Sequence, residues 1–188
     1  GVVQAITSAA PQVQLRLLGE GSSDDQDLAQ GLVDLDIGAA PPTSASLRVR
    51  LIASDPMMLV TSRNSALDVE RPTPDAITSV PHIAISRRGR DRGPLDDRLA
   101  EVGLTRRIIA IVPTTAAALA ILTTTTSATV VPERLTHSLP AGLIARPLPF
   151  TLQSAPITLS WHRRHDSDPA HAWLRDIVSA TLSAEPID

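Results

Sequence analysis

LAQGLVDLDIGAAP, residues 28–41, indicates the class of fold. It predicts an amphipathic helix that ends at Gly31, an apolar strand over Leu32–Ile37, and a loop that opens at Gly38. Glycine suits position 31 because the residue after a helix often takes a left-handed conformation that strains a Cβ. In open α/β sheets, ligands bind at the carboxyl ends of the strands. The stretch therefore predicts a helix, a parallel strand and a ligand-facing loop.

The composition is that of a globular protein without a DNA-binding surface of its own. The net charge of the 188 residues is −3, whereas a self-sufficient DNA-binding domain is usually strongly basic. Cysteine is absent, which excludes disulfides and thiolate metal sites. Only two Trp and one Phe are aromatic, so we do not expect a stacking surface for single-stranded nucleic acid.

No apolar run approaches the roughly 18 residues that identify a membrane-spanning helix. The N-terminus has no basic region and no cleavage site of a secretion signal. From these features we expect a protein of the cytoplasm that does not contact a membrane.

Helices and strands are expected to alternate in two runs, roughly 13–55 and 82–148, with short strands near 57–61 and 156–161 between them. This pattern predicts two α/β lobes joined by two crossing strands, with the C-terminal helix returning to the first lobe. Ligand pockets favour clefts between such lobes. The expected strands are 13–18, 32–37, 47–53, 57–61, 82–86, 107–112, 128–131, 143–148 and 156–161. The expected helices end near 10, 30, 80, 101, 122 and 137, and the last begins at Pro169 after Asp168 as N-cap.

Five motifs in a fixed order, with an arginine-rich loop after one strand, resemble a known family. They are P-x-V-x-L-x-L-L-x-E-G (11–21), L-x-x-G-x-V-D-L-x-I-G (28–38), V-P-T (112–114), A-T-V-V-P-E-R-L (128–135) and W-H-x-R-H-x-x-D-P-A-x-x-W-L-R (161–175). Together they resemble the effector-binding domain of LysR-type transcriptional regulators. Within that family the chain is most similar to the branch related to nitroaromatic- and salicylate-responsive regulators.

The resemblance implies the α/β fold of type 2 periplasmic binding proteins, with two Rossmann-like subdomains joined by two crossing strands. Subdomain I would comprise residues 1–57 and 155–188, and subdomain II residues 58–154. The chain opens inside a helix, so we expect that the first strand of the fold is missing from this sequence. An upstream winged helix-turn-helix domain is likewise implied and absent here.

The resemblance also implies the partners. A small anionic or aromatic effector would bind in the inter-lobe cleft, no cofactor would be needed, and the full-length protein would contact DNA only through its N-terminal domain. The family pattern implies homodimers, and tetramers of the complete regulator. In the dimer, the helix ending at Ala10 and strand 13–18 would meet helix 94–102 and strand 107–112 of the partner.

The strongest candidate for effector binding is the helix start at Thr114 and Thr115. Their hydroxyls and the free backbone N–H groups of a first turn suit a carboxylate, although both residues could be caps only. By resemblance, this helix start faces the effector and Ser86 lies where the family places a polar contact. Ser86 could equally be a turn residue. Arg87 is the one arginine of the loop 87–92 expected to attract an anion.

The remaining candidates would shape the site. Gly38 and Ala39 would form the wall of the cleft on the side of the first lobe. Ser23 caps a helix near the expected cleft, and capping alone is the stronger interpretation for it. The predicted effector-binding residues are therefore Ser23, Gly38, Ala39, Ser86, Arg87, Pro113, Thr114 and Thr115.

A metal site is not expected, although histidines and acidic residues gather near the last helix: His162, His165, Asp166, Asp168 and His171. Structural zinc usually needs four convergent ligands. Here the spacing crosses a strand end, a loop and a helix, so surface histidines around a helix start are the preferred interpretation.

Catalytic motifs are also missing. The sequence contains no G-x-S-x-G elbow, P-loop or G-x-G-x-x-G. Asp34 and Asp36 share one face of an expected strand and are interpreted as solvated or capping residues. A ligand sensor is therefore preferred to an enzyme. The alternative is the solute-binding protein of a transporter, which has the same fold and would need a secretion signal or lipid anchor upstream.

Overall fold

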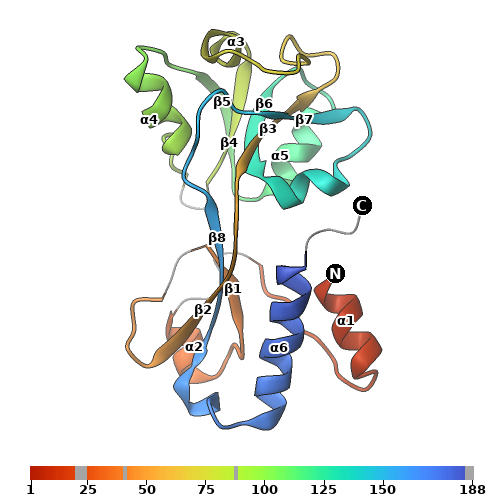
Figure 1. The fold of residues 1–188 in the computed structure, drawn as a ribbon. Helices are drawn as coiled ribbons and strands as arrows, with labels where there is room; N and C mark the ends of the chain where they lie inside the picture. The colour runs from red at the N-terminus through yellow and green to blue at the C-terminus, as the bar shows by residue number, and fades with distance from the viewer. Residues whose placement is uncertain (20–24, 40–41, 87–88, 185–188) are drawn as a thin grey trace. The chain divides into compact units, whose positions relative to one another are not determined.

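The computed structural model describes residues 1–19, 25–39, 42–86 and 89–184. The chain forms two compact units (Figure 1). Unit 1 comprises Gly1–Ser54 and Pro156–Asp188, and unit 2 comprises Asp55–Ala155. Unit 2 is thus an uninterrupted segment, whereas unit 1 is built from both ends of the chain.

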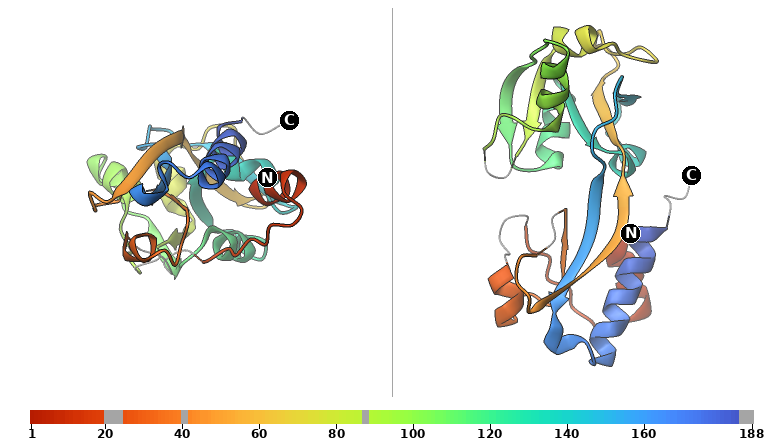
Figure 2. Two further views of the ribbon diagram at one scale, coloured as in Figure 1. Left: turned by 90° about the horizontal axis from the view of Figure 1, so that it is seen from below. Right: turned by 60° about the vertical axis from the view of Figure 1, so that its left-hand side comes forward.

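Unit 1 contains a three-stranded sheet and helices from both chain ends (Figure 2). Its elements are α1 (Val2–Ala9), α2 (Asp25–Gln30), β1 (Asp36–Gly38), β2 (Leu47–Asp55), β8 (Ala155–His162), the 3₁₀ turn η2 (Arg163–His165) and α6 (Pro169–Ser183). The strand order is β1-β8-β2, with β1 antiparallel to β8. Helices α1 and α6 pack against each other. The centre of this core is formed by Ile6, Leu159 and Val178.

Unit 2 is a five-stranded sheet with helices on both faces. Its elements are β3 (Met57–Ser62), α3 (Pro74–Ser79), β4 (Pro81–Ile85), α4 (Pro94–Glu101), β5 (Arg107–Val112), α5 (Thr115–Leu122), β6 (Ala128–Pro132), η1 (Glu133–Ser138) and β7 (Leu143–Pro147). The strand order is β5-β4-β6-β3-β7. Strand β4 is parallel to β5 and β6, and β3 is antiparallel to β6 and β7.

The helices of unit 2 bury opposite faces of this sheet, because successive side chains of a strand point to opposite sides. Val60 packs with Ala118 and Leu122 of α5. Its neighbour Leu59 packs with Ile77 of α3 on the other face. Both strand residues are fully buried. The parallel strands β4, β5 and β6 therefore have their carboxyl ends together, and α5 begins at that end.

The elements expected in unit 2 are confirmed almost throughout, with helix 94–101 and strand 107–112 at the predicted bounds. Helix α4 begins with Pro94 after Gly93, and α6 begins with Pro169 after Asp168. Proline suits the first position because its missing N–H would have no partner inside the helix.

Two strand predictions for unit 1 are wrong. Residues 13–18 form no strand, and Leu17 is 74% exposed. The predicted parallel strand 32–37 is reduced to β1, which is antiparallel to β8. The backbone N–H groups of Leu32 and Val33 instead donate to the carbonyl of Asp27, and so complete the end of α2 around Gly31. Gly31 has the expected left-handed φ of 77°.

Candidate functional site

Helix α5 begins shortly after β5 ends, so its first turn lies at the carboxyl end of the parallel strands. Thr114 is the N-cap: its hydroxyl accepts a hydrogen bond from the N–H of Ala117 at 3.2 Å. Thr115 and Ala116 are the first two residues of α5. Their N–H groups belong to the first turn, in which no carbonyl of the helix accepts from them. Thr115 is half-buried and Thr114 exposed. The capping role is therefore real, and N–H donors remain for a carboxylate.

Ser86 lies beside this helix start. Its N–H donates to the carbonyl of Val112 at 2.9 Å, which extends the β4–β5 ladder by one residue toward Pro113. The hydroxyl oxygen of Ser86 accepts from the N–H of Arg90 at 2.8 Å, and the carbonyl accepts from Gly89. Ser86 thus closes the turn after β4. A hydroxyl that accepts one bond can still donate its proton, so it can also contact a ligand.

The charged groups before and after α4 are paired with one another. Asp96 accepts from the N–H of Gly93 at 2.8 Å and from two nitrogens of Arg106 at 2.8 and 2.7 Å. Burial opposes ionisation of Asp96, but the hydrogen bonds and charge of Arg106 outweigh it and hold the pKa below its usual value. Arg92 lies 3.8 Å from Asp97 in an exposed pair. Arg87 lies outside the described residues.

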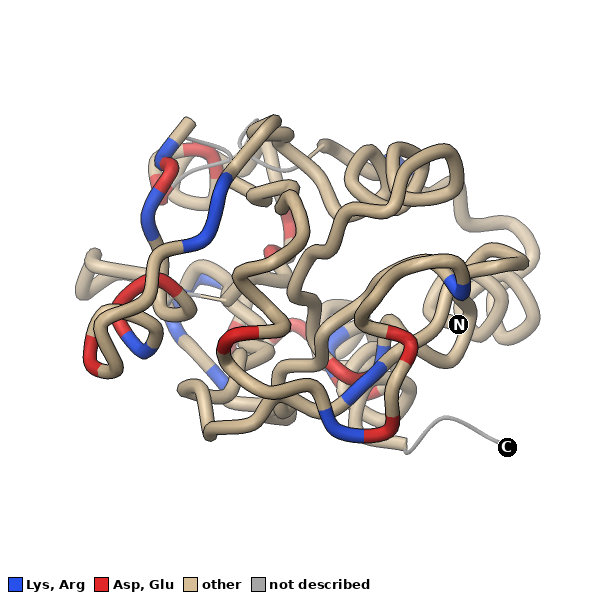
Figure 3. Tube along the Cα trace, turned by 90° about the horizontal axis from the view of Figure 1, so that it is seen from above, with Lys and Arg blue, Asp and Glu red and all other residues tan. Residues whose placement is uncertain are grey.

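Charges of both signs are interspersed along the trace in Figure 3, as expected for a net charge of −3. An extended basic surface of the kind that binds the nucleic-acid backbone would instead gather one sign on one face.

The candidates in unit 1 lie at the end of β1. Gly38 pairs with Thr158 of β8, whose hydroxyl donates to the Gly38 carbonyl at 2.9 Å. Ala39 follows and is exposed. Ser23 lies outside the described residues. Of the eight predicted residues, the structure thus gathers Ser86, Pro113, Thr114 and Thr115 at one end of unit 2.

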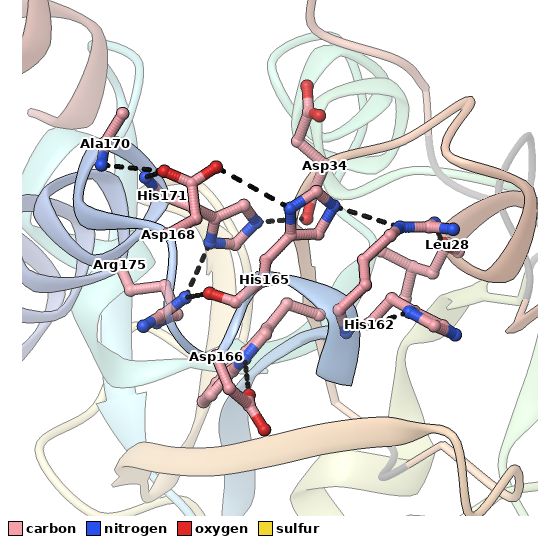
Figure 4. A network of polar contacts seen from close by, with 11 residues as sticks. Leu28, Asp34, His162, His165, Asp166, Asp168, Ala170, His171 and Arg175 are labelled. Atoms are coloured by element: carbon pink, nitrogen blue, oxygen red, sulfur yellow. Dashed lines mark hydrogen bonds and ion pairs between the residues drawn. The ribbon is translucent and has the colours of Figure 1, made fainter.

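The histidines near α6 are not all at the surface, contrary to the prediction. His171 is only 6% exposed, and its ring stacks on that of His165 with 4.5 Å between centroids (Figure 4). Nη1 of Arg175 lies 2.8 Å from Nδ1 of His171. An arginine can only donate, so Nδ1 accepts and the proton of His171 is on Nε2. That nitrogen lies 2.9 Å from the carbonyl of Asp34.

His165 completes the network. Its Nε2 accepts from Nε of Arg164 at 3.2 Å, and Arg164 also donates to the carbonyls of Leu28 and Ala29 at the end of α2. Burial lowers the pKa of His165, and the positive charge of Arg164 lowers it further. Arg164 therefore connects the end of α2 to His165, and the ring of His165 stacks on His171 in the first turn of α6. In this way the network fastens α2 to the start of α6. Among the described residues, no group of His, Asp and Glu could hold a metal ion.

Residues 1–183 match the family model of the LysR substrate-binding domain. The chain belongs to this family. The membership predicted from the five sequence motifs is thereby confirmed, and the chain is an effector-binding domain of LysR-type transcriptional regulators.

Curated relatives of this LysR domain include two transcriptional activators. It is 25% identical to NagR of a Ralstonia species over 185 residues, which are 97% of this chain and 62% of NagR. It is 30% identical to NahR of Pseudomonas putida over 155 residues, which are 81% of this chain and 52% of NahR. The LysR domain thus spans between half and two thirds of the length of these relatives.

Solved LysR structures share the fold. The regulatory domain of MexT, a transcriptional activator in Pseudomonas aeruginosa, matches with a TM-score of 0.83 at 22% identity, over 95% of this chain and 90% of that one. The effector-binding domain of QuiR, solved with shikimate, matches with a TM-score of 0.70 at 17% identity, over 96% and 88%. The predicted α/β fold of type 2 periplasmic binding proteins is confirmed.

These relatives are transcriptional regulators, which does not favour the alternative of a transporter's solute-binding protein. No described helix is both long and apolar enough to cross a membrane.

Proposed function

We propose that this LysR domain binds a small organic anion, such as an aromatic carboxylic acid, and couples its presence to the DNA-binding activity of a longer protein. The start of α5 beside Ser86 is the observation that supports this proposal. The carboxylate would accept bonds from the first N–H groups of α5 and from the hydroxyls of Thr115 and Ser86. Further contacts with the effector remain predictions; they would come from Ser23, Gly38, Ala39 and Arg87.

The effector would act by preferring one conformation of the domain. A ligand shifts a conformational equilibrium only by the difference between its affinities for the two states. DNA contacts would belong to a helix-turn-helix domain upstream in the whole protein, acting in the cytoplasm.

A calorimetric titration with benzoate, salicylate, shikimate and acetate tests the site. We expect one acid to bind, and Thr115→Val to weaken its binding about tenfold, because one hydrogen bond to a charged group contributes roughly 1.5 kcal/mol. The matched control is Thr78→Val, which removes an exposed hydroxyl that donates to the carbonyl of Asp75. Equal affinities of the two variants would contradict the site at α5.

We also propose that the domain pairs with a second copy of itself. Unit 2 exposes apolar side chains on the edge strand β5, where Ile109 is 48% and Ile111 40% exposed, and just after α4, where Val102 is 58% exposed. Unit 1 exposes Val13 and Leu17. If residues 1–18 of one copy pack against residues 94–112 of the other, these apolar side chains become buried, which would stabilise the dimer. Sedimentation at rising concentration should show a dimer, and a strict monomer would contradict the pairing.

A further inference from the structure

The carboxyl end of α2 is held by one arginine from the other end of the chain. Arg164, in the turn η2, donates from Nη1 to the carbonyl of Ala29 at 2.9 Å and from Nη2 to that of Leu28. Both carbonyls belong to the last turn of α2, where they have no partner within the helix. A Cβ at Gly31 would lie only 3.4 Å from Nη2. Since α2 has six residues and short helices are marginal by themselves, this cation at its carboxyl end stabilises it.

The position of Arg164 depends on a neutral His165. Nε of Arg164 donates to Nε2 of His165 at 3.2 Å. A ring nitrogen that accepts carries no proton, so the proton of neutral His165 is on Nδ1. Nδ1 lies 3.9 Å from Oδ2 of Asp168. A second proton on His165 must therefore go to Nε2, the atom that accepts from Arg164.

The stacked ring of His171 is a poorer place for that proton (Figure 4). Its accepting nitrogen Nδ1 lies 2.8 Å from Nη1 of Arg175. Both residues are only 6% exposed, and the guanidinium of Arg175 also lies over the ring of Trp161 at 4.8 Å. Arg175 is thus fixed by packing, whereas Arg164 is exposed and His165 is half-buried. We therefore expect the proton on His165, and Arg164 is the arginine that can move away.

The surroundings of His165 set the pH at which it takes up this proton. Burial lowers its pKa from 6.5 and the charge of Arg164 lowers it further, while the carboxylates of Asp168 and Asp34 oppose the shift. Uptake is therefore expected below pH 6.5. The charged and titratable groups around the ring are His162 at the end of β8, Arg164 in η2, Asp34 before β1, and Asp168, His171 and Arg175 at the start of α6.

We propose that His165 is a pH switch that controls the attachment of α2 to η2. Protonation of Nε2 replaces the hydrogen bond from Arg164 with repulsion between two cations. Arg164 then leaves, and the last turn of α2 loses its donors. The imidazolium gains the nearby carboxylate of Asp168, so the change is local and reversible. The switch lies in unit 1, outside the candidate site at the start of α5, and neither proposal depends on the other.

NMR of the whole chain between pH 7.5 and 5 tests the switch. In this range His82, whose pKa burial lowers to about 4, stays largely neutral. The ring of His165 should carry its proton on Nδ1 at pH 7.5 and become an imidazolium at pH 5. The N–H groups of Leu32 and Val33 donate to the carbonyl of Asp27 at the end of α2. Their exchange, relative to intrinsic rates, should become about tenfold faster with the same midpoint, the change expected for one lost hydrogen bond to a charged group.

His165→Gln is the decisive variant, because the oxygen of a glutamine side chain can accept from Arg164 and does not titrate. The two amides should then exchange slowly at pH 5 as well. Arg164→Gln should make their exchange fast at both pH values and raise the pKa of His165, since a neighbouring positive charge is gone. The control is His137→Gln, at an exposed position in unit 2, which should keep the pH dependence of the original chain.

Three results would overturn the proposal. They are slow exchange of the two amides at pH 5 in the original chain, acid-induced exchange that persists in His165→Gln, and protonation of His171 before His165. Equal acceleration of the amides of α6 would show that all of unit 1 opens, and would contradict a local switch.

Discussion

His82 is a fully buried histidine in β4, and the sheet around it is built for its neutral form. Its Nε2 lies 2.8 Å from the carbonyl of Ile77, and its Nδ1 has no partner in the described chain. Burial lowers its pKa to about 4, from 6.5. The bond to Ile77 and the charge of Asp96 oppose this shift, while the charge of Arg106 adds to it.

The lowered pKa makes the stability of the domain depend on pH. Between pH 6.5 and about 4 the unfolded chain binds a proton at His82 that the folded chain does not. The contribution of neutral His82 is therefore complete above pH 6.5 and is lost as the pH falls, by on the order of 3 kcal/mol in total. Urea titrations across this range measure it.

His82→Gln should flatten this part of the pH profile, whereas His137→Gln, at an exposed position, should not. An unchanged profile in His82→Gln would assign the acid sensitivity to other groups, among which His165 is the first to examine.

At the scale of single elements, α4 is held by a buried ion pair. The side chains of Asp96 and Arg106 are 10% and 8% exposed, and they join the first turn of α4 to the residue before β5. Gly93, the N-cap of α4, has no side chain that could cap the helix. The carboxylate of Asp96 binds the Gly93 N–H in its place.

Arg106→Met should therefore destabilise the domain by about 3 kcal/mol, because it leaves a largely buried carboxylate without its partner. The control Arg92→Met breaks an exposed pair and should cost less than about 1 kcal/mol. Urea unfolding of both variants gives the comparison. If Arg106→Met and Arg92→Met cost the same, the Asp96–Arg106 pair does not hold α4.

Elements of this local kind were predictable from the sequence. Pro94 and Pro169 indicate helix starts, and the apolar run of 107–112 predicts a strand. Residues 13–18 carry an equally good strand pattern, yet a strand also needs a neighbour for its backbone groups, and local sequence does not show whether one is present. The candidate effector site divides in the same way: Thr114 is recognisable as a cap, whereas the hydrogen bond from the Ser86 N–H to the Val112 carbonyl depends on the pairing of β4 with β5.

At the scale of the whole molecule, the exposed apolar side chains of β5 predict association. Ile109→Asp should shift the domain toward the monomer, because a charge would have to be buried in the proposed interface. Analytical ultracentrifugation measures the change. Val69→Asp is the control, since Val69 is also exposed, at 46%, but lies outside the proposed pairing surfaces. Loss of the dimer in both variants would show that the effect is not specific to β5.

The order of segments along the chain has a consequence for synthesis on the ribosome. Domains generally fold as units as the chain emerges. Once Ala155 has left the ribosome, all of unit 2 is outside it, so its sheet can close while the C-terminal part of unit 1 is still inside. The first 54 residues must wait for β8 and α6, with Ile6 exposed until Leu159 and Val178 arrive. A nascent chain at this stage would therefore carry a folded second unit and an open first one, a natural target for chaperones.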